Sequence, residues 1–294
     1  MDQVSITVFT PTYNRAYRLG NLYTSLLNLN YTNFEWIVVD DGSTDDTETL
    51  MESFQKEGKI RMIYKKQDNQ GKHVAINKGV ELAGGKLFFI VDSDDELTEN
   101  SLSVVNEKYI IHRDNPLIAG VVGIRGIKKG DRPVDKSYDF EELICSPLEF
   151  RYTYNITGDM AEVFVTDILK KYPFPVFEGE NFCTESLIWN RMAKDYQLVY
   201  FNSVIYIGEY LEDGLTAKYW NLIKKNPKAS ALYYSELSAS KIPLRHQLSA
   251  LEHYWTIVRN DKNKTFYEKL KPVSFLKSVY VLAALFISHR FKKI

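Results

Sequence analysis

Three aspartates follow a short apolar segment, and their spacing suits the binding of a divalent cation. Residues 88–91 are Phe-Phe-Ile-Val, which is typical of a buried strand, and Asp92, Asp94 and Asp95 come next. In an extended backbone the side chains of Asp92 and Asp94 lie on the same face. Two carboxylates so placed repel each other unless a cation lies between them, and oxygen ligands favour Mg²⁺ or Mn²⁺. The alternative interpretation is a solvated acidic turn that caps the following helix.

The chain around these aspartates alternates between strand-like and helix-like patterns. The predicted strands are residues 5–10, 34–39, 60–64 and 87–91, and the predicted helices are residues 19–29, a segment ending near Glu57, and residues 73–82. This alternation predicts right-handed βαβ units and a mostly parallel sheet. The polar loops then lie at the carboxyl ends of the strands, where such sheets bind ligands.

The second half of the chain has weaker patterns. Residues 128–138 are expected to form an exposed loop, and residues 173–182 an aromatic loop bounded by prolines. The other expected elements are a helix at 102–111, a strand at 117–124, a capped helix beginning at Thr157, a helix at 185–192 with Thr184 as its N-cap, a strand at 199–210, and helices from Tyr219 onward.

Charge is distributed unevenly along a chain of ordinary globular composition, in which 45% of the 294 residues are hydrophobic and 26% are charged. From Ala217 to the end there are 15 Lys/Arg against 4 Asp/Glu, which leaves 22 against 34 before that point. A basic tail on an acidic body indicates an anionic surface as the partner of the tail. No helix-turn-helix, zinc-finger or aromatic RNA-binding signature accompanies the charge, so we expect no nucleic-acid partner.

The tail also carries an apolar segment with basic flanks. Residues 279–287 are unbroken apolar residues, too few to span a bilayer. A helix of this kind can lie on an anionic membrane surface, and the alternative is a helix packed on the body or in the seam of a homo-oligomer. Cys145 and Cys183 lack metal-ligand spacing, and no signal peptide is visible. We expect a cytoplasmic protein, peripheral at the inner face of the cell membrane.

Residues 1 to about 110 closely resemble the family 2 glycosyltransferases, which have the GT-A fold. The motifs that carry the resemblance are residues 10–15 (Thr-Pro-Thr-Tyr-Asn-Arg), 40–45 (Asp-Asp-Gly-Ser-Thr-Asp), 69–79 and 92–95 (Asp-Ser-Asp-Asp). The resemblance implies an α/β GT-A catalytic domain over residues 1–216, with a nucleotide-sugar half (1–110) and an acceptor half (111–216). Residues 217–294 would form a helical basic extension.

The resemblance also implies roles for the residues of these motifs. It places Thr10, Pro11, Tyr13, Arg15, Asp41 and Ser93 at the nucleotide. Tyr13 can offer a flat face to a base, or pack beneath the sheet edge. Asp41 can accept a hydrogen bond from the ring N–H of uracil, which cytosine lacks, and this favours uridine. Its alternative role is to cap the helix that follows.

Phosphate and metal ligands are implied in the same way. Lys72 is expected at a phosphate, with a solvated lysine as the alternative. Asp94 is expected to bind the metal, and Asp92 to contact ribose or the metal. Asp95 could support the metal ligands or contact the sugar, while Asp159 could contact the acceptor or the sugar, or cap a helix.

The catalytic base is expected on the helix after the aromatic loop. Similar enzymes commonly have Glu-Asp where this chain has Glu185-Ser186, and the aspartate is assigned as the base. Because Ser186 replaces that aspartate, Glu185 becomes the first candidate and Glu180 the second. The alternative role of Glu185 is a first-turn residue that is favourable to the helix dipole.

The function expected from these residues is a metal-dependent, inverting transfer of a hexosyl or N-acetylhexosaminyl group. The donor would be a UDP-sugar, and the acceptor a saccharide or a lipid-linked saccharide of polysaccharide biosynthesis. Two other classes remain open. A sugar nucleotidyltransferase would need a glycine-rich basic loop after the first strand, which residues 11–14 do not provide. A non-catalytic nucleotide-sugar binding module could lack the base, and Ser186 keeps that interpretation open.

Overall fold

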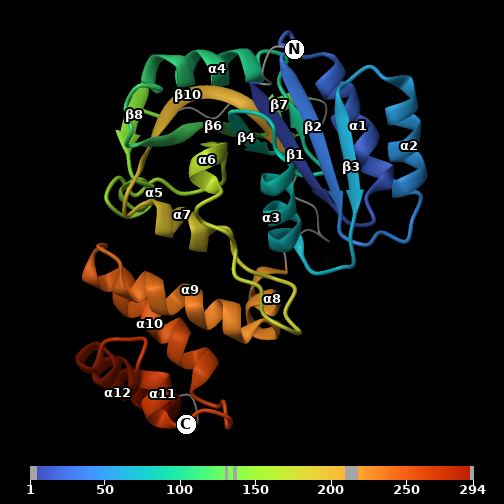
Figure 1. The fold of residues 1–294 in the computed structure, drawn as a ribbon. Coiled ribbons are helices and arrows are strands. Elements are labelled where there is room, and N and C mark those ends of the chain that lie inside the picture. Colours follow the sequence, from blue (N-terminus) through green and yellow to red (C-terminus); the bar gives the residue numbers. More distant parts are fainter. Residues whose placement is uncertain (1–4, 130–131, 135–137, 209–217, 292–294) are drawn as a thin grey trace.

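A large mixed sheet forms the upper part of the molecule in the view of Figure 1, above the carboxyl-terminal helices. The computed structural model describes residues 5–129, 132–134, 138–208 and 218–291. The sheet order is β3-β2-β1-β4-β9-β6-β10-β5, with β7 paired to β6 and β8 paired to β10. The strands are β1 (Ile6–Thr12), β2 (Phe34–Asp40), β3 (Met62–Lys66), β4 (Leu87–Ile90), β5 (Glu96–Leu97), β6 (Ile118–Lys129), β7 (Arg132–Val134), β8 (Glu142–Cys145), β9 (Met160–Val165) and β10 (Gln197–Gly208).

Helices cover both faces of this sheet, and each face has its own apolar core. One core joins the sheet to α1, α2 and α4, and the other joins it to α3 and α5–α7. The helices are α1 (Ala16–Leu27), α2 (Thr47–Glu57), α3 (Lys72–Leu82), α4 (Ser101–His112), α5 (Pro147–Tyr152), α6 (Thr166–Leu169), α7 (Ser186–Met192), α8 (Tyr219–Lys225), α9 (Pro227–Ala239), α10 (Leu244–Val258), α11 (Phe266–Leu270) and α12 (Phe275–Phe291). The predicted α/β class is confirmed.

The amino-terminal half has the predicted βαβ arrangement, because β1 pairs in parallel with both β2 and β4, and β2 pairs in parallel with β3. The first strand runs two residues further than expected, through Pro11 to Thr12. The carbonyl of Phe9 accepts from Val91 on the β4 side, so Pro11, two residues on, faces that same side. Pairing with β4 ends at Phe9, so the N–H that proline lacks is not needed there.

The helix expected to begin at Thr157 is wrong, because residues 160–165 form β9 in the middle of the sheet. This strand is antiparallel to both β4 and β6. Phe164 contributes to one core and Val163 to the other, so both faces of β9 are covered. The polar turn before the segment resembles a helix cap, but burial on both faces favours the strand.

The carboxyl-terminal helices continue the core of the body. Buried residues of α8, α9 and α10 belong to the same apolar cluster as Phe9 and Phe88 of the sheet. Arg191 of α7 forms a bidentate ion pair with Glu236 of α9, at 2.7 and 2.9 Å. The boundary expected at residues 216/217 lies outside the described residues. Among the described residues, no helix is both long and apolar enough to cross a membrane.

Candidate active site

The polar loops after β1 and β2 are joined to each other at the carboxyl edge of the sheet. Asn14 has a positive φ of 53°, which turns its backbone N–H toward the hydroxyl of Ser43, at 2.8 Å. In return its side-chain carbonyl accepts from the backbone N–H of Thr44, also at 2.8 Å. Asparagine tolerates this left-handed conformation better than most residues. Tyr13, next to this link, leaves 49% of its surface exposed, so its ring is available to a ligand.

Thr10 and Pro11 lie inside the sheet rather than on its edge. Both are buried, and the hydroxyl of Thr10 accepts from the indole N–H of Trp36 at 3.0 Å. The side chain of Thr10 therefore serves the core. Thr10 can affect the expected nucleotide site only indirectly, by helping to fix the end of β1.

Asp41 is buried and orders the loop before α3. Its carboxylate accepts from the side-chain N–H of Gln67 and the backbone N–H groups of Gln70 and Gly71, at 2.7 to 2.9 Å. The alternative role of Asp41 as a helix cap is not observed, since Asp45 accepts from the backbone N–H of Thr47, the first residue of α2. Contact of Asp41 with uracil stays a prediction.

Lys72, the first residue of α3, connects the metal motif with the first candidate base. Its ammonium lies 2.6 Å from the carboxylate of Asp92 and 2.9 Å from that of Glu185, while the side chain is 23% exposed. Burial acts to lower the pKa of Lys72, but the two carboxylates outweigh it and hold the pKa above its ordinary value. Loops after β3 and β4 and the start of α7 thus meet at one cation, although the sequence places them far apart.

Asp94 lies in the same acidic loop, beside Arg15. The guanidinium of Arg15 is 4.0 Å from the Asp94 carboxylate, and both side chains are about a fifth exposed. Burial and the charge of Asp92 raise the pKa of Asp94, while Arg15 and Lys72 oppose this. The two aspartates of the motif therefore concentrate negative charge that a cation would relieve.

Asp95 is held behind this pair by residues of the second half. Tyr206 of β10 donates to Asp95 at 2.6 Å and accepts from the backbone N–H of Asp92 at 3.0 Å. Arg125 of β6 lies 3.3 Å from Asp95 and 3.8 Å from the exposed Asp159. Burial and Asp92 raise the pKa of Asp95 to about 6, against the opposing charge of Arg125. Asp95 thus ties the loop to the sheet.

Glu180, the second candidate base, is bonded to a helix terminus. Its two carboxylate oxygens accept from the backbone N–H groups of Lys228 and Ala229 at 2.7 and 2.9 Å, in the first turn of α9. Glu185 directly precedes α7 and faces Lys72 instead. The geometry favours Glu185 as the candidate base, and its catalytic role stays a prediction.

Three residues near the site were not found from the sequence: Arg125, Tyr206 and Glu162. Arg125 fits because Gly208 leaves it room, since a Cβ there would lie 2.0 Å from the guanidinium. Glu162 lies in β9, which was predicted as a helix, so no strand register pointed to it. Burial raises the pKa of Glu162 to about 7, with Arg151 opposing and Glu185 adding to the shift.

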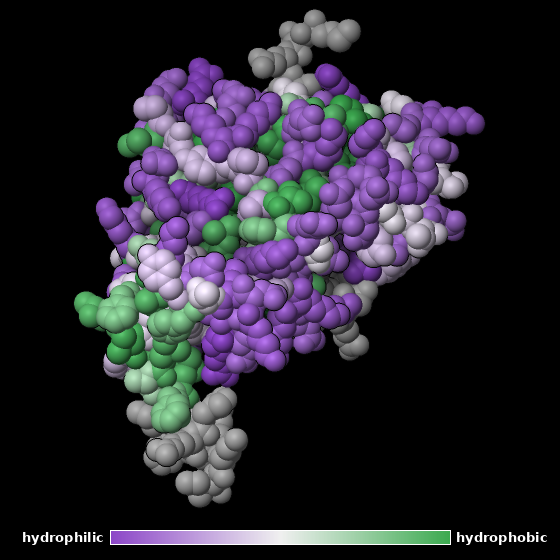
Figure 2. Space-filling view, turned by 60° about the horizontal axis from the view of Figure 1, so that its bottom comes forward, coloured by the Kyte–Doolittle hydropathy of each residue, from purple (hydrophilic) through white to green (hydrophobic). Residues whose placement is uncertain are grey.

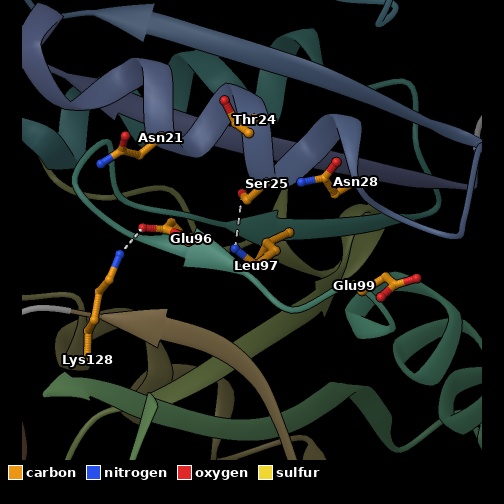
Figure 3. A pocket seen from close by; sticks show the side chains of 8 residues that line it. All are labelled: Asn21, Thr24, Ser25, Asn28, Glu96, Leu97, Glu99 and Lys128. Carbon is orange, nitrogen blue, oxygen red and sulfur yellow. Dashed lines mark hydrogen bonds and ion pairs between the residues drawn. The ribbon is translucent and has the colours of Figure 1, made fainter. Parts of the chain in front are cut away.

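A cavity of about 610 Å³ lies away from these carboxylates. Figure 3 shows Asn21, Thr24 and Asn28 projecting from α1 above β5, and Lys128 paired with Glu96 at 2.8 Å. Glu96, which lines this cavity, directly follows Asp95 of the metal motif in the chain. None of the residues expected at the nucleotide, the metal or the base lines it.

The donor set of Asp92 and Asp94 fits a hard cation with an incomplete protein shell. Within the part of the chain that the structure describes, no group of three or more His, Cys, Asp or Glu side chains could hold a metal ion. Asp92 is 38% exposed, so its oxygens are accessible. Magnesium typically binds through one or two carboxylates and takes its other ligands from water and substrate phosphates, which is the arrangement that this pair allows.

Comparison with known proteins places this arrangement among sugar transferases. A match to the family described as "Glycosyl transferase family 2" covers residues 7–166. The Campylobacter jejuni GalNAc(5)-diNAcBac-PP-undecaprenol beta-1,3-glucosyltransferase is 33% identical over 104 residues, which are 35% of this chain and 34% of that relative. Matches to the first curated relatives span about a third of their length or less.

Solved structures share the fold at low identity. Staphylococcus aureus TarS in complex with UDP-GlcNAc has a TM-score of 0.66 at 20% identity, covering 95% of this chain and 79% of that one. The Pyrobaculum calidifontis mannosyltransferase PcManGT, in complex with GDP-Man and Mn²⁺, has a TM-score of 0.57 at 16% identity, covering 96% and 80%. The family match spans more than half of the chain, and on that basis the chain belongs to glycosyl transferase family 2.

Proposed function

We propose that the protein is a metal-dependent inverting glycosyltransferase that moves a hexosyl or N-acetylhexosaminyl group from a UDP-sugar to an acceptor hydroxyl. The observation that carries the proposal is the position of Lys72 between Asp92 and Glu185. A phosphate-binding cation, a metal-motif carboxylate and a candidate base face one space at the carboxyl edge of a parallel sheet, where such folds bind ligands.

Each residue has a separate task in this reaction. Lys72 exchanges its carboxylate partners for the diphosphate of the donor, which frees Glu185. Glu185 then accepts the proton of the acceptor hydroxyl as that oxygen attacks the anomeric carbon. Mg²⁺ or Mn²⁺ at Asp92 and Asp94, when bound, neutralises charge on the departing diphosphate. A single displacement from the face opposite the diphosphate inverts the anomeric centre.

The nucleotide end of the site supports a UDP-sugar. Tyr13 is accessible for stacking on a base, and Asp41 fixes the loop that leads to Lys72. TarS was solved with UDP-GlcNAc, whereas PcManGT was solved with GDP-Man. Preference for uridine therefore rests on the acceptor capacity of Asp41 toward the uracil ring N–H.

A lipid-linked saccharide at a membrane is the proposed acceptor. The name of the Campylobacter relative contains an undecaprenol diphosphate carrier. In this chain α12 packs against α10 and buries Ser278 and Val281, but it leaves other apolar side chains exposed, Leu276 at 79%. Figure 2 shows apolar surface at the carboxyl-terminal end of the molecule, at the lower left. Among the side chains that the structure describes, the large exposed apolar residues of α11 and α12 are Phe266, Tyr267, Phe275, Leu276, Val279, Tyr280 and Phe286.

Lysines border this apolar face, which suits an anionic bilayer. Lys262, Lys264 and Lys271 are exposed beside it. A helix with one face packed on the body can place its exposed apolar face in the headgroup region of a bilayer while lysines pair with anionic lipids. We therefore place the protein at the inner face of the cell membrane. A second copy of the chain is the competing occupant of the same face.

The test is a ligand screen followed by a turnover measurement. UDP with Mn²⁺ should raise the melting temperature, and UDP-sugars should be ranked in the same way. UDP release should then require an acceptor and should fall 10²–10⁴-fold in Glu185→Gln, the usual contribution of a general base, with UDP affinity retained. Glu178→Gln, an exposed acid of the same loop, is the matched control.

The two other classes give different outcomes. A non-catalytic binding module would be stabilised by UDP and Mn²⁺ and release no UDP with any acceptor. A sugar nucleotidyltransferase would produce diphosphate from UTP and a sugar 1-phosphate. Either result would overturn the proposed function.

A further inference from the structure

The segment before α7 is held by the junction of α8 and α9 rather than by its own helix. Glu180 accepts from two backbone N–H groups of the first turn of α9. A carboxylate at this position satisfies donors that have no partner within the helix and interacts favourably with the helix dipole. The ammonium of Lys228 also donates a hydrogen bond to the backbone carbonyl of Glu178, at 3.1 Å. The loop and the helix terminus therefore complete each other's hydrogen bonds.

Asn226 binds the next two residues of the same segment. It is 1% exposed, and its side-chain carbonyl accepts from the backbone N–H groups of Asn181 and Phe182 at 2.8 and 3.1 Å. Its amide N–H donates to the carbonyl of Leu222 in α8 at 2.8 Å. One buried side chain thus links α8 and the start of α9 to the loop. A buried amide with its partners satisfied fixes geometry, because losing one partner costs about 1–3 kcal/mol.

The opposite side of the segment lies against the start of α3. A Cβ built on Gly71 would be 1.8 Å from the carbonyl oxygen of Asn181, so the two backbones are in direct contact. Gly71 has a φ of 96°, which also favours glycine. Lys72 follows it and pairs with Glu185, a few residues beyond Asn181. Figure 1 shows this yellow segment passing close to α3 and α8.

We propose that Glu180 and Asn226 are positioning residues for the base of the transfer reaction, and that the α8–α9 junction is part of the catalytic unit. The inference rests on the proposed function of Glu185. The segment 180–185 lies between two helix starts, one carrying Lys72 and the other capped by Glu180. Removing the caps on the α9 side leaves Lys72 and the metal motif intact and allows Glu185 to shift. A misplacement of about 1 Å can lower turnover about 10²-fold.

The experiment compares Glu180→Ala and Asn226→Ala in the full chain, with Glu178→Ala as the matched control. Hydrogen exchange without ligand should show loss of protection at the amides of Asn181 and Phe182 in Asn226→Ala. UDP release from UDP-GlcNAc with Mn²⁺ should fall 10- to 100-fold in both variants, while UDP affinity stays within about twofold. In Glu180→Ala and Asn226→Ala the rate should still fall at low pH as it does in the wild type, whereas Glu185→Gln should lose this pH dependence.

Conservative variants separate positioning from folding. Asn226→Asp keeps the acceptor oxygen but loses the N–H that Asn226 donates to Leu222, so it should recover part of the rate relative to Asn226→Ala. Glu180→Gln, which keeps one acceptor, should also be intermediate. Normal UDP release in folded Glu180→Ala and Asn226→Ala would overturn the inference, as would unchanged exchange at Asn181. If the wild-type protein releases no UDP, the proposed function fails, while the exchange measurement still decides whether the junction holds the segment.

Discussion

Replacing Glu162 by glutamine should make the protein more stable, and only at neutral and alkaline pH. Glu162 is a partly buried carboxyl of β9 whose pKa is about 7 in the folded chain, against an ordinary value of 4.5. Burial is the main cause, and the charge of Glu185 adds to it. The folded state binds this proton more tightly than the unfolded state. The contribution of protonated Glu162 to the free energy of unfolding is therefore fully present below pH 4.5 and is lost as the pH rises through 7.

The size of the effect follows from the shift. One pKa unit corresponds to about 1.4 kcal/mol, so ionised Glu162 costs the wild-type protein about 3 kcal/mol above pH 8. Contact with solvent reduces this, and we expect about 2–3 kcal/mol. Glutamine has nearly the same shape and no charge, so Glu162→Gln should match the wild type at pH 4.5 and exceed its free energy of unfolding by this amount at pH 8.

Urea denaturation at pH 4.5, 6 and 8, followed by tryptophan fluorescence, measures this difference. The chain has four tryptophans, of which Trp36 and Trp255 are fully buried. Glu178→Gln, which removes an exposed acid, should show no comparable pH dependence. In the background of Glu185→Gln the gain should be smaller, because one source of the raised pKa is gone. A gain for Glu162→Gln that is equal at all three pH values would refute the reasoning.

Three other predictions concern the metal, the nucleotide and the tail. Asp94→Asn should keep the fold, and thermal stabilisation by UDP should no longer depend on Mn²⁺; unchanged metal dependence would remove Asp94 from the site. UDP should compete better than CDP in a displacement assay, and Asp41→Ala should weaken UDP binding and also destabilise the chain, because three N–H donors lose their acceptor. Leu276→Glu should reduce cosedimentation with anionic vesicles without changing UDP affinity, and binding of the wild type should weaken with salt over a screening length of about 10 Å at 0.1 M. If the wild type instead self-associates independently of salt, and Leu276→Glu abolishes this, then a second copy of the chain covers the apolar face of α11 and α12.

The sequence predicted residues 1–110 well because the signals there are local. Strands 1 to 4 alternate with helices at clear periodicities, and turn chemistry at residues 40–45 and 92–95 marks where strands end. The short strand β5 was not predicted, and the other differences there lie at element ends, such as the continuation of β1 through Pro11. Strand pairing explains that difference, since the missing N–H faces the side where β4 has already ended.

The second half was harder to predict because its important contacts are distant in the chain. The position of Glu162 near the site was not predicted, because β9 is covered by an apolar core on each face of the sheet. The periodicity of a single sequence does not reveal such burial. The position of Glu180 as a cap depends on a helix that begins at Pro227. Tyr206 and Arg125 look like ordinary strand residues until the sheet order brings them beside Asp95.

The contact between Gly71 and Asn181 has a consequence for when the protein becomes active during its synthesis. The strands from β1 to β4 and their helices are made first, and amino-terminal units generally fold before the rest of a chain is complete. The backbone of Asn181 and the start of α9 are made much later, and closing such long loops slows folding. A growing chain would therefore form the Asp41 loop and the start of α3 well before Glu185 is fixed, while the loop of Asp92 waits for Tyr206 of β10. On the proposed function, nucleotide binding would precede turnover of the donor, which would begin only after the α8–α9 junction has docked.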